Sequence, residues 1–297
     1  MGRDPYPEAV AGIPNVRLTL PSRPENVLLV RQALRGLADA VDLDAIELND
    51  ISTALSEACN NVVAHAYPDG EGPMEVELRG SPDGLDVLVR DHGCGLNPHA
   101  SEPSEIGGIG IPVMLALADS VEFAGSDGDG TDVRMRFATP KAAAIGTAPG
   151  GGQAPADELP GEGEGDDEGV YLAVGPPRLA RAVVARVLAA VAARARLSTE
   201  RIATTGALAE QLVDHLAGTE DSGRLAVAAT LTPRRLDLLV GPLGAGSSLD
   251  GLAPTLEQLT QDHEVLRRGS TELLALRLSE GSEAAAGASN GGTPDGR

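Results

Sequence analysis

Apolar residues recur between residues 16 and 137 at two different periods. Spacings of three and four predict amphipathic helices, whereas strict alternation of apolar and polar residues predicts strands with one buried face. The helices are expected at 24–38, with Ser22 as the cap, at 48–66 and at 111–117, and the strands at 17–20, 74–78, 85–89 and 133–137. This part of the chain is therefore predicted to fold as one compact unit of helices and strands.

The composition changes abruptly after this unit. Residues 142–169 are rich in Ala, Gly, Pro and acidic residues, and they have too little apolar surface to form a core. We therefore expect a flexible arm at 1–13, a folded unit at 14–140, an acidic linker at 141–169, a second folded unit at 170–280 and a disordered tail at 281–297.

The second unit resembles a degenerate copy of the first. The strand sequence LDVLV at 85–89 matches LDLLV at 236–240, and several Pro and Gly positions match at the same offset of 151 residues. Repeats of this length indicate a duplicated domain rather than a solenoid. The alternative is that two unrelated units share the same apolar periodicity.

Charge and composition narrow the class of protein. The 297 residues carry a net charge of −21, which argues against a nucleic-acid backbone or an anionic membrane as partner. The apolar fraction of 42% suffices for cores built from Val, Leu, Ile and Ala. Two cysteines cannot form a disulfide framework, and the first residues lack the apolar stretch of a signal peptide. We expect a reduced, cytoplasmic protein.

The first chemical motif lies on the helix expected at 48–66. Glu57 and Asn61 are four residues apart, so they project from the same helix face. A carboxylate can deprotonate an attacking hydroxyl group, and an amide oxygen suits Mg²⁺, which also takes phosphate oxygens and water. Taken alone, a Glu and an Asn at this spacing are more typical of an ordinary solvated helix face.

Two glycine-containing motifs follow. Residues 91–95 (Asp-His-Gly-Cys-Gly) come directly after the strand at 85–89, where a carboxylate can accept a hydrogen bond from an exocyclic amine and glycines allow close backbone approach. Residues 106–112 (Ile-Gly-Gly-Ile-Gly-Ile-Pro) open the helix at 111–117, where free N–H groups attract phosphate. Taken alone, the motif at 91–95 is typical of a turn, and a glycine-rich helix start such as 106–112 is weak evidence for a phosphate site.

In order and spacing, these motifs resemble the GHKL (Bergerat-fold) ATPases. Residues 56–67 (Ser-Glu-Ala-Cys-Asn-Asn-Val-Val-Ala-His-Ala-Tyr) and 107–111 (Gly-Gly-Ile-Gly-Ile) look like motifs of the bacterial anti-sigma-factor serine kinases within that superfamily. The resemblance covers about residues 16–139. It implies an α+β two-layer sandwich whose mixed, mainly antiparallel sheet has helices on one face, and it implies ATP and Mg²⁺ as cofactors.

The resemblance also implies roles for the motif residues. Glu57 is expected to be the general base, Asn61 the Mg²⁺ ligand and Asp91 the acceptor for the adenine amino group. The other residues are expected to shape the pocket, meet the phosphates or lie beside the adenine: Gly93, Gly95, Gly107, Gly108, Gly110 and Thr131.

The function implied is a serine kinase that phosphorylates an anti-anti-sigma (STAS-like) protein and sequesters a sigma factor, as a homodimer or with the second unit as a built-in pseudo-partner. An equal alternative for the second unit is a fixed platform that docks the substrate. No Lys or Arg lies between Arg90 and Arg134, so phosphoryl transfer would lack a side-chain cation there. The alternative is therefore a non-catalytic, ATP-binding partner-switching module.

The second unit is not expected to bind nucleotide. At the offset of 151, the residues in the places of Glu57, Asn61 and Asp91 are Leu208, Leu212 and Pro242. None of these side chains can act as a base, a magnesium ligand or an acceptor for adenine.

Overall fold

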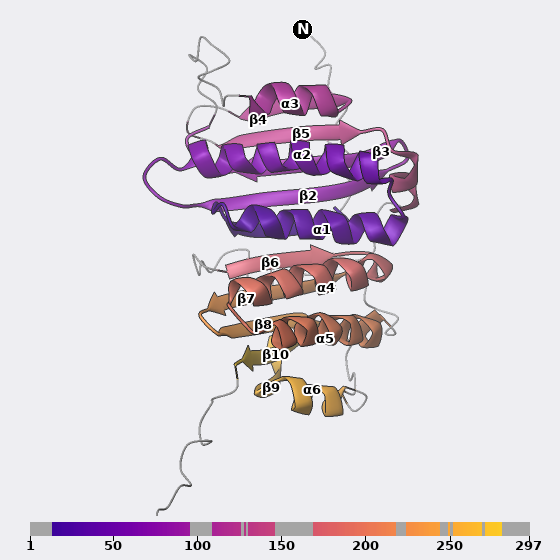
Figure 1. Ribbon diagram of the computed structural model, residues 1–297, viewed down its shortest axis with the longest axis vertical. Coiled ribbons are helices and arrows are strands. Elements are labelled where there is room, and N and C mark those ends of the chain that lie inside the picture. The colour runs from indigo at the N-terminus through magenta and orange to yellow at the C-terminus, as the bar shows by residue number, and fades with distance from the viewer. Residues whose placement is uncertain are drawn as a thin grey trace, which may run out of the picture.

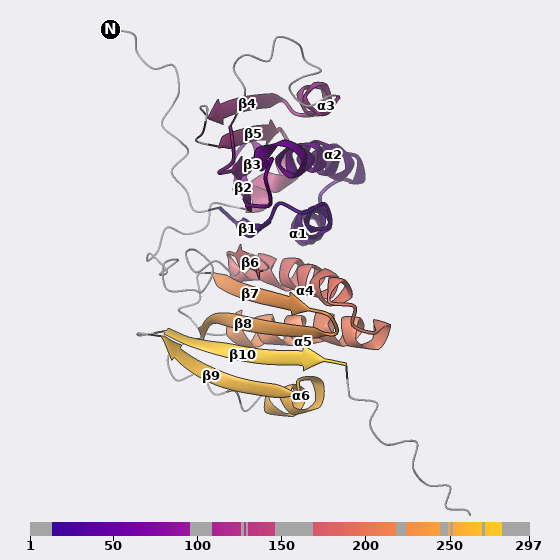
Figure 2. The same ribbon diagram turned by 90° about the vertical axis from the view of Figure 1, so that its left-hand side faces the viewer.

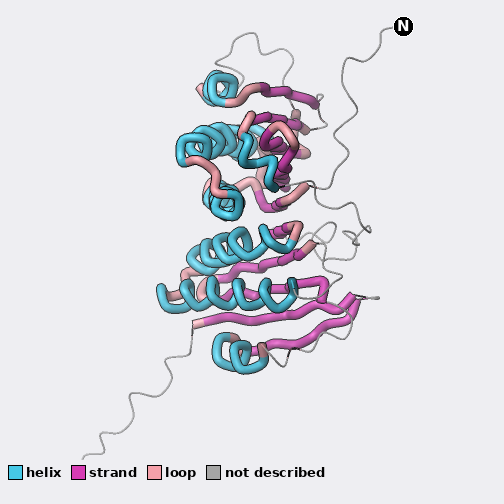
Figure 3. The backbone as a smooth tube through the Cα atoms, turned by 90° about the vertical axis from the view of Figure 1, so that its right-hand side faces the viewer, coloured by secondary structure: helices cyan, strands magenta, loops and turns pink. Residues whose placement is uncertain are grey.

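One sheet of ten strands runs the length of the molecule, and the described helices lie on one of its faces (Figure 1). The computed structural model describes residues 14–95, 109–125, 128, 130–145, 169–217, 224–243, 249, 252–268 and 271–280. The two layers are seen side-on in Figure 2 and Figure 3. The nine pairings between described strands are all antiparallel, which confirms the expected class of α+β sandwich with an antiparallel sheet.

The first half of the chain supplies five strands in the order β4-β5-β3-β2-β1. Its apolar positions lie where the two periods predict them, because the buried stripes of α1 and α2 pack on the inward side chains of the strands. The elements are β1 (Val16–Pro21), α1 (Asn26–Val41), α2 (Ala45–Asn61), the π-helical turn η1 (Val62–Ala66), β2 (Pro73–Ser81), β3 (Gly84–Asp91), α3 (Gly110–Leu117), β4 (Ser120–Gly125), β5 (Thr131–Phe137) and the 3-10 helix η2 (Pro140–Ile145).

Three local features differ from the sequence prediction. Ser22 does not cap α1: the cap residue is Glu25, and the Ser22 hydroxyl instead accepts a hydrogen bond from the Gly72 N–H at 3.1 Å. The edge strand β4 was not predicted, because its side chains are exposed or only half-buried and its apolar signal is weak. The folded part of the first unit also runs past the predicted boundary at 140, since Ile145 is buried against β2.

The second half repeats the order of elements, strand-helix-helix-strand-strand-helix-strand-strand. Its strand order, β6-β7-β8-β10-β9, corresponds to β1-β2-β3-β5-β4 of the first half. The elements are β6 (Gly169–Val174), α4 (Pro177–Arg194), α5 (Thr199–Ala217), β7 (Leu225–Thr232), β8 (Arg235–Leu243), α6 (Ala253–Leu259), β9 (Asp262–Arg268) and β10 (Thr271–Ser279).

Burial corrects the correspondence predicted between α5 and α2. The hairpin turns at 82–83 and 233–234 keep the offset of 151, but the buried stripe of α5 repeats that of α2 at an offset of 154. The places of Glu57 and Asn61 are therefore taken by Gln211 and His215, not by Leu208 and Leu212. This change of offset from 151 to 154 accompanies a connection from α5 to β7 that is shorter than the connection from α2 to β2. The two stripes are Ile51, Ala54, Leu55, Ala58 and Cys59 in α2, and Thr205, Leu208, Ala209, Leu212 and Val213 in α5.

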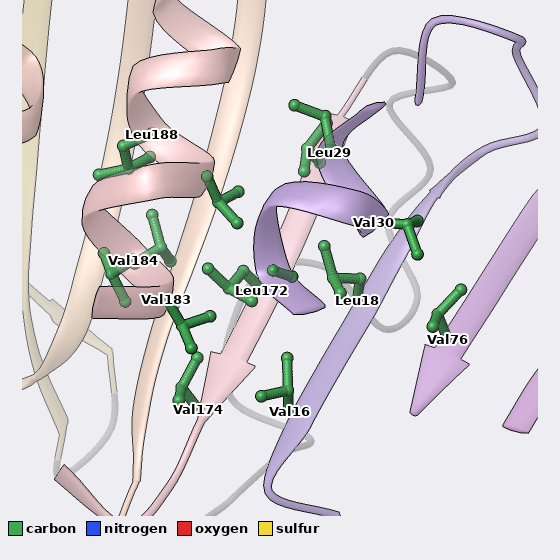
Figure 4. Packing of buried hydrophobic residues seen from close by; sticks show 14 of the residues in the cluster. Val16, Leu18, Leu29, Val30, Val76, Leu172, Val174, Val183, Val184 and Leu188 are labelled. Carbon is green, nitrogen blue, oxygen red and sulfur yellow. The ribbon is translucent and has the colours of Figure 1, made fainter. Parts of the chain in front are cut away.

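The two halves meet along β1 and β6. These strands pair antiparallel, with Val16 opposite Val174 and Leu18 opposite Leu172, and α1 packs against α4 above them (Figure 4). The helices approach closely, because a Cβ atom on Gly36 would lie only 2.6 Å from the Cα of Val183. The junction therefore belongs to one continuous hydrophobic core.

The remaining domain predictions fall largely on residues that are not described: the arm at 1–13, most of the linker at 141–169 and the tail at 281–297. Within the described residues, none of the helices combines the length and hydropathy needed to cross a membrane.

Candidate functional site

Helix α2 positions the acid and the amide of the first motif. It begins earlier than its apolar period predicts, because Asp44 caps it by accepting from the Ile46 N–H at 2.8 Å and Glu47 completes a capping box. Its buried stripe faces the sheet, which leaves Glu57 and Asn61 half-buried at the margin of the core. The predicted i, i+4 arrangement is therefore present in the structure.

Gly110 brings a third motif residue to the same place. It is the first residue of α3, and a Cβ atom built on it would lie 2.9 Å from Oε2 of Glu57 and 3.4 Å from Oδ1 of Asn61. The start of α3 thus lies against the side chains of Glu57 and Asn61. Because Gly110 has no side chain, both can approach the backbone of α3 directly. A helix start carries free N–H groups that favour an anion, so the base, the amide and a phosphate-attracting backbone converge.

Asp91 is the last residue of β3. Its carboxylate is buried, and its Oδ1 accepts a hydrogen bond from the Gly93 N–H at 2.9 Å. Burial raises the pKa of Asp91, although hydrogen bonds from Gly93 and Thr131 act in the opposite direction. Thr131 lies directly opposite Asp91 in the β3–β5 pairing. These three residues form a second group, around a carboxylate removed from water.

The loop after Asp91 is tied to the end of the π-helical turn η1. The Cys94 N–H donates to the Ala66 carbonyl at 2.9 Å, and a Cβ atom on Gly93 would lie 2.0 Å from that same oxygen. Only glycine therefore fits at position 93. Gly95 has a φ of 77°, in the left-handed region that favours glycine. The π-helical turn η1 thus joins the two groups of motif residues, since it begins directly after Asn61.

A charged pair stiffens the strands beside Asp91. The Arg90 guanidinium donates to both carboxylate oxygens of Asp132, at 2.6 and 2.8 Å, across β3 and β5. This pairing holds the pKa of Asp132 below its usual range. Because Asp132 follows Thr131 directly, the pair fixes the register in which Asp91 and Thr131 meet.

No group of three or more His, Cys, Asp and Glu side chains is arranged to hold a metal ion in the part of the chain that the structure describes. A divalent cation at Asn61 would therefore take most of its ligands from phosphate oxygens and water, which is the mode that Mg²⁺ prefers beside a nucleotide. An amide oxygen, a nearby helix start and the space left by Gly110 fit a phosphate-bound cation.

The structure therefore brings together two groups of predicted site residues. Glu57, Asn61 and Gly110 meet between α2 and α3, and Asp91, Gly93 and Thr131 meet at the ends of β3 and β5. The predictions for Gly107 and Gly108 lie outside the described residues.

Ala66 and Tyr67 also contact this site, and neither was assigned a role from the sequence. The backbone carbonyl of Ala66 anchors the loop at 93–94, and the hydroxyl of Tyr67 accepts a hydrogen bond from the His92 N–H at 2.9 Å. Tyr67 lies within the motif at 56–67, but nothing in its residue type indicates a contact with residue 92. That contact depends on the π-helical turn, which has no sequence signature.

The first half of the chain is similar to known proteins. Residues 20–137 match the histidine kinase-like ATPase domain. Serine-protein kinase RsbW of Bacillus pumilus (strain SAFR-032) is 33% identical over 129 residues, which are 38% of this chain and 80% of that protein. RsbW of Bacillus subtilis (strain 168) is 31% identical over 127 residues, which are 38% of this chain and 79% of that protein.

A relative with another name aligns over a similar share of this chain. The anti-sigma F factor of Clostridium beijerinckii (strain ATCC 51743 / NCIMB 8052) is 31% identical over 125 residues, which are 39% of this chain and 87% of that protein. The matches thus span most of each relative but well under half of this chain. Through its first half, the chain belongs to the histidine kinase-like ATPase family, together with serine-protein kinase RsbW and the anti-sigma F factor.

Proposed function

We propose that this protein is an ATP- and Mg²⁺-dependent serine protein kinase and anti-sigma-type regulator, active in its first half. Family membership supports the reaction class. The observation that carries the proposal is the convergence of Glu57 and Asn61 on Gly110 at the start of α3. Glycosidic, redox or nuclease chemistry would require different groups, whereas a base beside an amide oxygen and a helix start suits phosphoryl transfer.

In this proposal each residue has one task. Bound Mg-ATP supplies the transferable γ-phosphoryl group. The Glu57 carboxylate accepts the proton of the acceptor serine as its oxygen bonds to phosphorus and the bond to the ADP oxygen breaks. Asn61 provides an amide oxygen to Mg²⁺, and the backbone at Gly110 faces the phosphates.

The adenine end is assigned to the second group of residues. The Asp91 carboxylate accepts from the exocyclic amino group, Gly93 and Gly95 allow the loop to pass close to the base, and Thr131 lies beside it. The carboxylate already accepts from Gly93 and Thr131, and its two oxygens have further lone pairs with which to accept from a neutral N–H donor.

The acceptor we propose is a serine of an anti-anti-sigma (STAS-like) protein, and the sequestered partner is a sigma factor. The serine and the sigma factor are proposed from the names of the relatives, and the STAS-like class of the acceptor is proposed from the family resemblance of the motifs alone. Purified protein, Mg-ATP and a panel of STAS-domain proteins test this directly by phosphoserine formation. Phosphoserine that is lost in Glu57→Gln, with Mg-ATP affinity kept, supports the kinase.

The same experiment decides the alternative, a non-catalytic ATP-binding module in partner switching. The absence of Lys and Arg between Arg90 and Arg134 favours this module, because the spreading charge of the transition state would be left to the cation and backbone amides. Mg-ATP binding without phosphoserine on any acceptor would establish it.

We infer that the second half is a duplicate that serves as a built-in pseudo-partner of the first. The identical order of elements and the corresponding strand order support this inference. The pairing of β1 with β6 occupies the sheet edge through which a second chain could otherwise add. Light scattering tests it: the mass of one chain in solution supports the pseudo-partner, and twice that mass supports a homodimer.

We also propose that the second half does not bind nucleotide. Leu252, the N-cap residue of α6, occupies the place of Gly110, because each lies four residues before the buried side chain that anchors its helix, Leu256 or Met114. The Leu252 side chain is buried in the hydrophobic core, whereas Gly110 has no side chain. Pro242, in the place of Asp91, offers no side-chain acceptor.

A further inference from the structure

The π-helical turn η1 sets Tyr67 at an unusual position. The turn follows α2 without a break and widens the helix by one residue, so that Tyr67 leaves its end with φ −127° and ψ 81°. Such turns occur often at functional sites, because they redirect the side chains that follow. Here Tyr67 is directed toward the loop after β3, which it contacts through its hydroxyl.

The Tyr67 hydroxyl joins two backbone segments. It accepts a hydrogen bond from the His92 N–H at 2.9 Å and donates one to the Pro73 carbonyl at 2.7 Å. Pro73 is the first residue of β2, and His92 lies between Asp91 and Gly93. One phenol therefore links the start of β2 to the loop that carries the buried carboxylate.

The aromatic ring of Tyr67 is also held in place, by a close contact with Gly72. A Cβ atom on Gly72 would lie 2.2 Å from Cε1 of the ring, so the ring rests directly on the glycine backbone. Gly72 is itself held by Ser22, whose N–H donates to the Gly72 carbonyl at 2.8 Å and whose hydroxyl accepts from the Gly72 N–H. The phenol therefore has little freedom to move away from His92.

The phenol is protonated near neutral pH. Burial raises the pKa of Tyr67 above its usual value, and the nearby carboxylates of Asp91 and Glu75 act in the same direction. A neutral hydroxyl can donate to one partner while it accepts from another. Both of its hydrogen bonds are thus available at the same time.

We propose that Tyr67 is a positioning residue for the adenine end of the nucleotide site: its hydroxyl holds the loop at 91–95 in the conformation that binds the base. This inference rests on the proposed nucleotide site and adds a residue to it. Tyr67 touches no reacting atom, so it acts on affinity and not on the phosphoryl-transfer step.

The test compares full-length Tyr67→Phe with wild type and with Tyr171→Phe, which removes the same oxygen from β6 in the second half. Calorimetry with Mg-ATP and with adenosine is expected to give a Kd raised about 3- to 10-fold for both ligands in Tyr67→Phe. Equal factors are expected because the loop contacts the base and not the phosphates. Tyr171→Phe is expected to match wild type.

Two further readouts separate positioning from a general loss of structure. The backbone amide of His92 should exchange with solvent faster in Tyr67→Phe, because its acceptor is gone, while amides of α4 exchange as in wild type. In phosphoserine assays the KM for ATP should rise with kcat unchanged. Gly72→Ala, which displaces the ring, should reproduce the change in Kd.

The outcomes distinguish this inference from the proposed function. If wild type does not bind Mg-ATP, the proposed function fails and this inference fails with it. If wild type binds and Tyr67→Phe binds within twofold of it, or if the His92 amide exchanges at the wild-type rate, the positioning role alone is refuted.

Discussion

Replacing Gly110 by alanine tests the convergence of the base and the amide with one methyl group. The new Cβ atom would lie 2.9 Å from Oε2 of Glu57 and 3.4 Å from Oδ1 of Asn61. Ordinary contacts begin near 3.4 Å, so the Glu57 carboxylate must move by about half an ångström while the Asn61 amide can stay in place. The glutamate is a flexible side chain, and α3 itself need not shift.

The Gly110→Ala substitution should lower activity and leave the stability of the fold intact. Alanine suits the first turn of a helix better than glycine by up to about 1 kcal/mol, so the free energy of unfolding should stay equal or rise. A base displaced by a fraction of an ångström is expected to lower kcat by about 10-fold, in view of the roughly 10²-fold loss that a 1 Å misplacement can cause. Mg-ATP affinity should fall by a smaller factor.

The matched control is Gly206→Ala in α5. This glycine is also helical, but the nearest atoms to its added Cβ lie 3.9 Å away, so it gains helix propensity without a clash. Thermal denaturation, Mg-ATP calorimetry and phosphoserine formation on one acceptor should be measured for both variants. A stably folded Gly110→Ala protein with the affinity and turnover of wild type would refute the reasoning.

Three further predictions concern other parts of the molecule. Because burial raises the pKa of Asp91, adenosine affinity should fall on acidification at a higher pH than for an exposed aspartate, as the acceptor is lost when pH drops through that raised pKa; Asp91→Asn should bind weakly with no such dependence, and a wild-type affinity independent of pH would oppose this. Burial raises the pKa of the Cys59 thiol to about 12, so only exposed Cys94 should react with a thiol reagent in the native protein, more slowly with Mg-ATP bound; two reactive thiols before denaturation would contradict the structure. Gly36→Ala should lower the free energy of unfolding by about 1–3 kcal/mol in chemical denaturation, since its Cβ meets the backbone of α4, and unchanged stability would mean that α1 and α4 do not pack this closely.

The elements with a strong apolar period were predictable from the sequence. Helix α2 and strands β2, β3 and β5 lie where the pattern places them, because each has one face against the core. Their boundaries were less predictable. The start of α2 depends on the capping box at Asp44, and the edge strand β4 packs only one weak face, so neither has a long apolar signal.

Pair contacts within the site could be predicted only where spacing fixes them. Glu57 and Asn61 share a helix face because they are four residues apart, and this was predicted. The contact of Tyr67 with His92 and that of Gly93 with Ala66 follow from the π-helical turn, which arises from packing. The offset of 154 in α5 was not apparent because its Leu- and Ala-rich sequence matches α2 in several registers.

Titration of the full-length protein with Mg-ATP in a calorimeter tests the central claim most directly, with Asn61→Ala and a magnesium-free titration as controls. We predict one nucleotide bound per chain, with the heat strongly reduced when either the Asn61 amide or the cation is removed. Two nucleotides per chain would contradict the proposal that the second half does not bind nucleotide. No binding heat at all would contradict the nucleotide site itself.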